Sequence, residues 1–192
     1  MQKRLFIIHG WGGYPEDAWM PWLKTELEAR EYQVIVPSLP DSDEPRINNW
    51  IPKIQEVVGI PDEQTFFVGH SMGCQAIARY LSTLPEGTVV GGAVFVAGFF
   101  KRLTGITDDP IERSVEREWL DTPLDLKKVQ SHMKKSIALF SDDDQFVPLD
   151  NQEEFANLLG SKIIIERNMG HFDRSRKIFE LPIVLDSILE LQ

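Results

Sequence analysis

Short apolar runs alternate with helical patterns along the whole 192-residue chain, and this alternation restricts the fold more than any other feature. Most of the runs are continuously apolar, which is typical of strands that are buried on both faces of a parallel sheet. Six strands are predicted, at Arg4–Ile8, Gln33–Val36, Thr65–Val68, Gly92–Val96, Ser136–Phe140 and Lys162–Ile165. Helices are predicted around them, at Trp19–Arg30, Ile47–Val58, Met72–Leu84, Ile111–Trp119 with Leu126–Ser131, Gln152–Leu159 and Pro182–Leu191.

This order of elements predicts βαβ units, and hence an α/β fold with a doubly wound parallel sheet of about six strands and helices on both faces. No linker, internal repeat or low-complexity tract divides the chain, so we expect one domain over residues 1–192 without a separate cap domain. The longest stretch without a strand runs from Ala97 to Lys135 and starts at the carboxyl end of a strand. Ligands bind at such ends in open α/β sheets, so this stretch is predicted to form a lid or a pocket wall.

A serine flanked by two glycines lies at one of the predicted strand–helix junctions. In the stretch FFVGHSMGCQAIARYL a strand ends at Val68, Gly-His-Ser-Met-Gly follows, and a helix begins at once. This G-x-S-x-G pattern predicts a tight, strained turn that exposes the hydroxyl of Ser71 at a helix N-terminus, where developing negative charge is favoured. Gly69 and Gly73 would avoid clashes with neighbouring backbone. The alternative is that Ser71 only caps the helix and that the glycines serve packing.

A serine hydroxyl needs a general base, and the chain has four histidines. His9 and His171 each follow a predicted strand at its carboxyl end, so either can reach Ser71. His70 cannot easily fold back onto its neighbour, and His132 precedes a strand at the opposite edge of the sheet. The chain order Ser…Asp…His selects His171 as the base.

The carboxylate that orients this histidine should follow a strand between the serine and the histidine. The stretch IALFSDDDQFVPLD offers three consecutive candidates there, and charge alone does not separate Asp142, Asp143 and Asp144. Any one of them could instead be a solvated turn residue or a helix cap.

Two backbone N–H groups are predicted to bind an oxyanion. One belongs to Met72, the residue after the serine, and the other to Trp11 in the loop HGWGG that follows the first strand. The glycines of that loop would let its backbone approach a substrate. Three aromatic residues in the long strand-free stretch predict an apolar substrate pocket, although a place in the core explains them equally well; they are Phe99, Phe100 and Trp119.

Composition narrows the choice of partners. The net charge of −10 argues against nucleic-acid and anionic-membrane partners, which require clustered Lys and Arg. The single cysteine, Cys74, excludes an intrachain disulfide and is expected to be a small packed helix residue. No apolar run approaches 18 residues, and the apolar stretch near the N-terminus is too short for a signal sequence, so a cytoplasmic location is expected.

The motifs HGWGG, GHSMG, DDDQFVP and GHF, in this order, resemble the α/β-hydrolase superfamily over essentially the whole chain. In that superfamily the acid that orients the histidine commonly precedes a V-P pair. The resemblance therefore assigns this role to Asp144. The short length and the HGWGG start are similar to the small serine hydrolases of the retinoblastoma-binding protein nine family, which have six parallel strands. That family is associated with ester hydrolysis, and one mammalian member with an aminopeptidase-like activity. The pocket-protein motif L-x-C-x-E is absent here, so no retinoblastoma interaction is expected.

The resulting hypothesis is a serine hydrolase of small carboxylic esters, with Ser71 as nucleophile, His171 as base and Asp144 as its orienting acid. No metal or organic cofactor is expected. The same groups would also support amidase, aminopeptidase-like or thioesterase activity, or transfer of the acyl group to an acceptor other than water. A catalytically inactive, partner-binding protein of the same fold is the alternative from another class.

Overall fold

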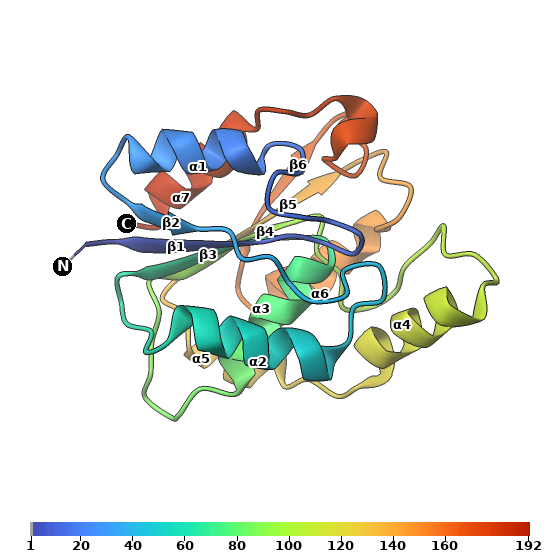
Figure 1. Cartoon of the computed structure of the whole chain (residues 1–192), viewed down its shortest axis with the longest axis horizontal. Helices are drawn as coiled ribbons and strands as arrows, with labels where there is room; N and C mark the ends of the chain where they lie inside the picture. Colours follow the sequence, from blue (N-terminus) through green and yellow to red (C-terminus); the bar gives the residue numbers. More distant parts are fainter. Residues whose placement is uncertain (1) are drawn as a thin grey trace.

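The structure, a computed structural model, describes residues 2–192 and contains one six-stranded sheet with the order β2-β1-β3-β4-β5-β6 (Figure 1). Every neighbouring pair of strands is parallel. Six continuous apolar runs therefore form one parallel sheet, as predicted. The strands are β1 (Arg4–Ile8), β2 (Gln33–Ile35), β3 (Thr65–His70), β4 (Gly92–Val96), β5 (Ser136–Ser141) and β6 (Lys162–Glu166).

Helices cover both faces of the sheet and enclose one apolar core on each side. One layer contains α1 (Met20–Glu28) and α7 (Pro182–Glu190), which lie together above the sheet in Figure 1. The core under this layer includes Leu23, Val68 and Ile188. The other layer, below the sheet in Figure 1, contains α2 (Ile47–Val58), α3 (Met72–Ser82), α5 (Leu126–Ser131) and α6 (Gln152–Leu158).

Strand β3 is longer than the sequence predicts, because it ends at His70 and not at Val68. Its pairing with β4 continues through Gly69 and His70, opposite Phe95 and Val96. The N–H of Ser71 then donates to the carbonyl of Val96 at 2.8 Å. The ladder of hydrogen bonds therefore carries the strand up to the serine and overrides the local preference of glycine for a turn.

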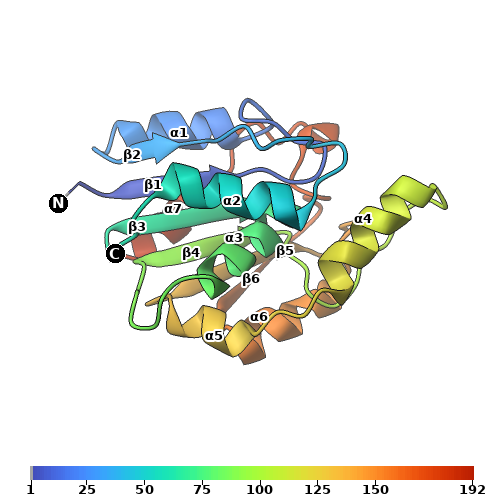
Figure 2. The same cartoon turned by 60° about the horizontal axis from the view of Figure 1, so that its bottom comes forward.

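The segment Ala97–Lys135 holds α4 (Pro110–Asp121), which projects from the end of the molecule where the strands finish (Figure 2). Its C-terminal half is fixed to the body of the protein. Glu118 pairs with Arg46 at 3.0 Å, and the indole N–H of Trp119 donates to the carbonyl of Pro45 at 2.9 Å. Trp119 is fully buried and packs edge-on against Trp50.

Among residues 2–192, no helix combines the length and the apolarity that crossing a bilayer requires.

Candidate active site

The junction between β3 and α3 holds Ser71 in a backbone conformation that non-glycine residues rarely adopt, with φ 53° and ψ −118°. The two flanking glycines make this turn possible. A Cβ on Gly69 would lie 2.8 Å from the backbone nitrogen of Cys74, and a Cβ on Gly73 would lie 2.1 Å from the carbonyl oxygen of Ile8. Both contacts are with backbone, which cannot move aside as a flexible side chain can. The close approach predicted for these glycines is therefore confirmed.

Gly73→Ala should destabilise the protein by at least about 2 kcal/mol, because the new methyl group would push α3 away from the end of β1. The matched control is Gly87→Ala. Gly87 is the third residue of a turn closed by the Thr88 N–H and the Pro85 carbonyl. It has φ 84° and no atom within 4 Å of its Cβ position, so the control introduces only the strain of a positive φ, worth about 1 kcal/mol. Urea unfolding measures both changes. If the two variants unfold at the same urea concentration, the clash at Gly73 is not what destabilises the protein.

His171 lies in the loop after β6, and its Nδ1 donates to Oδ2 of Asp144 at 2.8 Å. The other oxygen of Asp144 accepts the N–H groups of Phe146 and Val147 at 2.8 and 3.0 Å. The Asp144 side chain is only 2% exposed, so its charge is shielded from water by these bonds. Because Nδ1 carries the donated proton, Nε2 is left as the unprotonated nitrogen.

The two neighbouring aspartates do not touch the imidazole. Asp142 accepts the N–H of Asn168, and Asp143 accepts the N–H of Gly170 and pairs with Arg176. Asp173, two residues beyond His171, accepts the N–H and hydroxyl of Ser175. Of the candidate acids, only Asp144 is bonded to the ring of His171.

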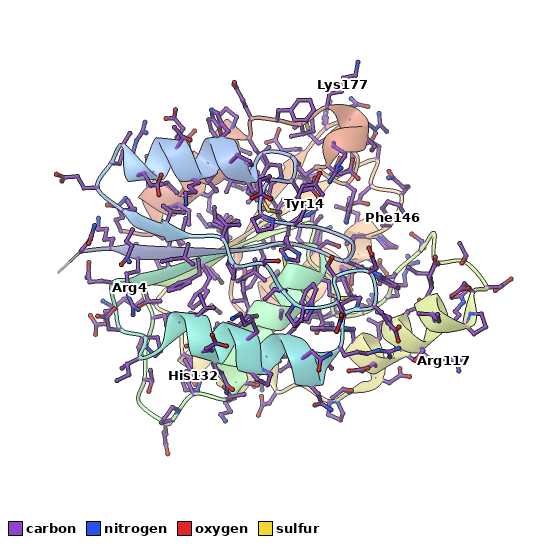
Figure 3. The ribbon with its side chains drawn as sticks, viewed as in Figure 1. Arg4, Tyr14, Arg117, His132, Phe146 and Lys177 are labelled. Carbon is purple, nitrogen blue, oxygen red and sulfur yellow. The ribbon has the colours of Figure 1, made fainter. Side chains whose placement is uncertain are left out.

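Two of the other histidines, His9 and His132, do not reach the serine hydroxyl. His9 is buried, its Nε2 accepts the N–H of Leu39 at 3.2 Å, and burial lowers its pKa. His132 contacts the carbonyl of Thr88 at 2.7 Å and lies on the opposite side of the molecule from Phe146 (Figure 3). The expectation that His9 can reach the site is therefore wrong, because its ring is turned into the core.

His70 is a site residue that the sequence analysis did not assign. Its Nε2–H donates to the backbone carbonyl of His171 at 2.8 Å, and the centroids of the two rings are 4.9 Å apart. Burial lowers the pKa of His70 to about 4, so the ring is neutral at pH 7. On its far side the indole of Trp19 packs edge-on and donates to the carbonyl of Phe172 at 2.9 Å. Nothing in the sequence signals these contacts, because they join segments about 50 residues or more apart.

The loop after β1 lies directly against the serine. A Cβ on Gly10 would be 3.1 Å from Cβ of Ser71, and the indole of Trp11 is fixed by donating to the carbonyl of Asp43 at 2.9 Å. Within residues 2–192, the backbone N–H groups of Trp11 and Met72 donate to no protein acceptor. Trp11 and Met72 line the same cavity as Ser71, so two free donors accompany the serine.

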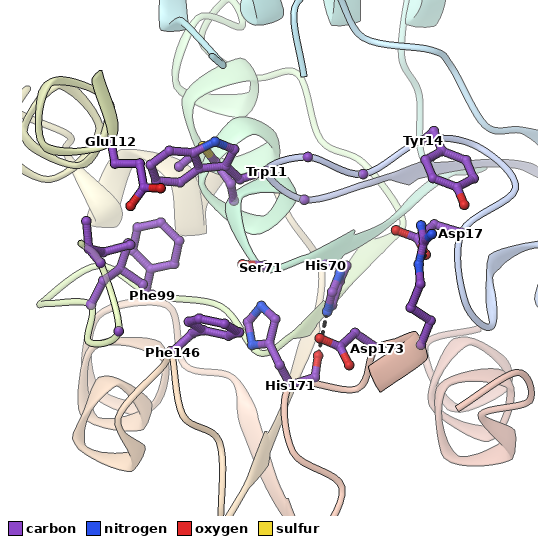
Figure 4. Close-up of a pocket in the computed structure, with 18 of the residues that line it drawn as sticks. Trp11, Tyr14, Asp17, His70, Ser71, Phe99, Glu112, Phe146, His171 and Asp173 are labelled. Atoms are coloured by element: carbon purple, nitrogen blue, oxygen red, sulfur yellow. Dashed lines mark hydrogen bonds and ion pairs between the residues drawn. The ribbon is translucent and has the colours of Figure 1, made fainter. Parts of the chain in front are cut away.

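A cavity of about 480 Å³ contains both Ser71 and His171. Figure 4 shows that Trp11, Phe99 and Phe146 lie to one side of Ser71, with Tyr14, Asp17 and Asp173 on the other. The cavity therefore has a largely apolar end, where the carboxylate of Glu112 also lies, and a charged end. Leu103 and Ile106 add apolar surface to its lining, and Arg174, which pairs with Asp17 at 2.7 Å, adds a charge.

Two of the three aromatic residues predicted for the pocket do not line this cavity. Phe99 does, but Phe100 packs on Phe155 with ring centroids 4.6 Å apart, and Trp119 is in the core. Tyr14, Asp17, Phe146 and Arg174 were missed, although Phe146 precedes the V-P pair and could have been inferred from that position. The segment Ala97–Lys135 supplies pocket wall through residues 99–112, as expected.

A family model described as serine hydrolase matches residues 5–189 of the chain. The chain belongs to the serine hydrolase family. This serine hydrolase is 31% identical to YdeN of Bacillus subtilis (strain 168) over 186 residues, which cover 97% of this chain and 94% of YdeN. It is 28% identical to the serine hydrolase RBBP9 of Rattus norvegicus over 182 residues, which cover 94% of this chain and 91% of RBBP9.

Solved structures give the same fold for this serine hydrolase. The crystal structure of the ydeN gene product from B. subtilis superposes with a TM-score of 0.89 at 30% identity, covering 98% of each chain. The esterase RhEst1 from Rhodococcus sp. ECU1013 superposes with a TM-score of 0.68 at 16% identity, covering 98% of this chain and 89% of that one. The fold is therefore that of the α/β hydrolases, and the resemblance to the retinoblastoma-binding protein nine family is confirmed.

Proposed function

We propose that this serine hydrolase is a carboxylesterase, in class EC 3.1.1, that cleaves small esters with Ser71, His171 and Asp144. The observation that carries the proposal is the 2.8 Å bond from His171 Nδ1 to the shielded Asp144, in a cavity that also contains Ser71. An orienting carboxylate, an imidazole and an exposed hydroxyl are the three groups that acyl transfer requires. That the esterase RhEst1 has the same fold supports the choice of an ester as substrate, by analogy of fold alone.

In the proposed reaction, Oγ of Ser71 attacks the ester carbonyl while Nε2 of His171 takes the hydroxyl proton. The tetrahedral intermediate collapses, the C–O bond to the alcohol breaks, and His171 returns the proton to the leaving oxygen. Water then attacks the acyl-enzyme by the same route and releases the acid and free Ser71. Asp144 keeps Nδ1 protonated throughout and stabilises the imidazolium that forms twice in each cycle.

The oxyanion of each tetrahedral intermediate is assigned to the backbone N–H groups of Trp11 and Met72. Both are free donors beside Ser71, and Met72 is the first residue of α3, where the helix dipole also favours negative charge. Neither donor depends on a side chain, so substitution of Trp11 should affect substrate packing more than oxyanion binding.

The decisive test is labelling with a fluorophosphonate probe, which reacts with activated serines. One label per molecule on the wild-type protein, located at Ser71, supports the proposal. A wild-type protein that is never labelled would favour the inactive, partner-binding alternative. A panel of p-nitrophenyl esters beside aminoacyl amides and acyl thioesters then identifies the leaving group, since one set of catalytic groups serves all three.

Short and medium acyl esters should be the better substrates. The apolar end of the cavity is built from a few side chains, and a cavity of about 480 Å³ lies in the lower half of the range for small-molecule sites. We expect kcat/KM for p-nitrophenyl butyrate to exceed that for the palmitate ester by at least about tenfold, because the long chain does not fit in the cavity with its ester at Ser71, and a displaced ester reacts more slowly. Faster turnover of emulsified long-chain esters would contradict this prediction.

A further inference from the structure

The loop that carries His171 is tied to the loop after β5 by four successive side chains. Residues 141–144 each accept one hydrogen bond from residues 168–171, and we call this set the 141–144 ladder. The ladder consists of Asn168 N–H to Asp142 Oδ1 (2.9 Å), Met169 N–H to Ser141 Oγ (3.0 Å), Gly170 N–H to Asp143 Oδ1 (2.7 Å) and His171 Nδ1 to Asp144 Oδ2 (2.8 Å).

Asp143 has three hydrogen-bond partners, as many as Asp144. In addition to the N–H of Gly170, its Oδ1 accepts the hydroxyl of Ser141 at 2.8 Å, and its Oδ2 pairs with Arg176 at 2.7 Å. Ser141 in turn accepts the N–H of Met169. Two of the four bonds therefore depend on the Asp143 carboxylate, although it never touches the imidazole.

The hydrogen bond from the Gly170 N–H to Asp143 fixes the backbone at the residue directly before His171. Gly170 has φ 55°, and a Cβ at this position would lie 2.8 Å from Cγ of Arg176, so the arginine side chain lies directly against the glycine. Asp143 holds this arginine from one side and the Gly170 N–H from the other. The backbone next to His171 is thus fixed by one carboxylate.

The position of the loop backbone and the orientation of the His171 ring are set by different interactions. Asp144 sets the tautomer and the rotation of the imidazole, but the position of the whole ring relative to Ser71 follows the backbone of the loop. A displacement of about 1 Å between reacting groups can cost about a hundredfold in rate. The position of the loop backbone therefore affects the rate, and the bond from Asp144 to the ring does not by itself fix that position.

We propose that Asp143 is a positioning residue for His171, acting through the hydrogen bond to the Gly170 N–H. This assignment rests on the proposed role of His171 as the base. The N–H of Gly170 is also the main reason that the pKa of Asp143 is lowered, so the carboxylate remains a charged acceptor at neutral pH.

The test compares two variants of Asp143 with one control. Asp143→Ala removes every acceptor and should lower kcat about a hundredfold with KM within about twofold. Asp143→Asn keeps an oxygen for the Gly170 N–H and should stay within about tenfold of the wild type. The control is Asp125→Ala, which removes a carboxylate that accepts the N–H groups of Lys127 and Lys128 at the start of α5, away from the cavity. It should lower the melting temperature and leave kcat unchanged.

A spectroscopic readout separates positioning from general damage and does not need activity. The Nδ1 proton of His171 is held in a charge-assisted bond to Asp144, so it should resonate far downfield in the proton NMR spectrum. The signal should broaden or vanish in Asp143→Ala and persist in Asp143→Asn and Asp125→Ala. An unchanged signal and kcat in Asp143→Ala would overturn the proposal, as would equal losses in the Ala and Asn variants. A wild type that shows the signal but hydrolyses no ester would instead count against the proposed function.

Discussion

Ser71→Ala should abolish hydrolysis, with a loss in kcat of at least about 10⁴-fold, and should not be labelled by a fluorophosphonate probe. Ser71 is held at φ 53° between a strand and a helix, and its hydroxyl is the group that becomes acylated in the proposed reaction. The remaining donors at Trp11 and Met72 would still bind substrate, so KM should change little. The measurement is steady-state hydrolysis of p-nitrophenyl butyrate, with mass spectrometry of the labelled protein.

The folded state should survive this substitution, because alanine removes only an oxygen that has no hydrogen-bond partner within residues 2–192. Circular dichroism and thermal unfolding check this point. Relief of strain does not enter, since alanine keeps the Cβ that makes a positive φ unfavourable. If the variant is still labelled once per molecule, another nucleophile is present and the assignment of Ser71 is wrong.

Asp144→Asn should lower kcat by at least about a hundredfold, and up to about 10⁴-fold, with the fold intact. The structure supplies the reason. The asparagine oxygen can still accept the N–H groups of Phe146 and Val147, which leaves its NH₂ group facing Nδ1 of His171. Nδ1 must then become an acceptor, the ring proton moves to Nε2, and the nitrogen facing Ser71 can no longer take a proton.

The neighbouring substitutions are the matched controls for this prediction. Asp142→Asn and Asp143→Asn should each stay within roughly tenfold of the wild type, because an amide oxygen still accepts the backbone N–H groups that bond to them. If Asp143→Asn loses activity while Asp144→Asn keeps it, the acid that orients His171 is Asp143. If all three variants are active, Asp173 is the next residue to test, since it also lines the cavity.

The features that follow from local rules were predictable from the sequence. Continuous apolar runs gave the number and the parallel pairing of the strands, because strands buried on both faces have no polar side to present. The glycines on either side of Ser71 were predictable because the turn itself demands them. The pairing of His171 with the third aspartate was found by resemblance, since charge alone left three candidates equal. The bond from Asp144 to His171 agrees with that choice.

The features that depend on packing between distant segments were not predictable. For Phe99, Phe100 and Trp119 the sequence left a substrate pocket and the core equally open, and it did not indicate which neighbour each ring meets. Trp119 faces the core because its indole meets the Pro45 carbonyl and the ring of Trp50, and both lie more than 60 residues away in sequence. The 141–144 ladder likewise depends on the register between β5 and β6, which places Ser141 opposite Glu166. The pattern of buried residues limits this register, but it does not indicate which side chains beyond the strand ends will meet.

The collisions around the glycines have a consequence for how this protein can change over evolutionary time. Around the serine, Gly10 packs against Ser71 and His70, and Gly69 and Gly73 pack against backbone, so almost any new side chain there disturbs the site. The opposite wall is built from side chains of residues 99–112, which precede the fixed half of α4 and stand clear of the nucleophile. Substrate range can therefore drift through mutations in that wall while the reaction itself is inherited unchanged.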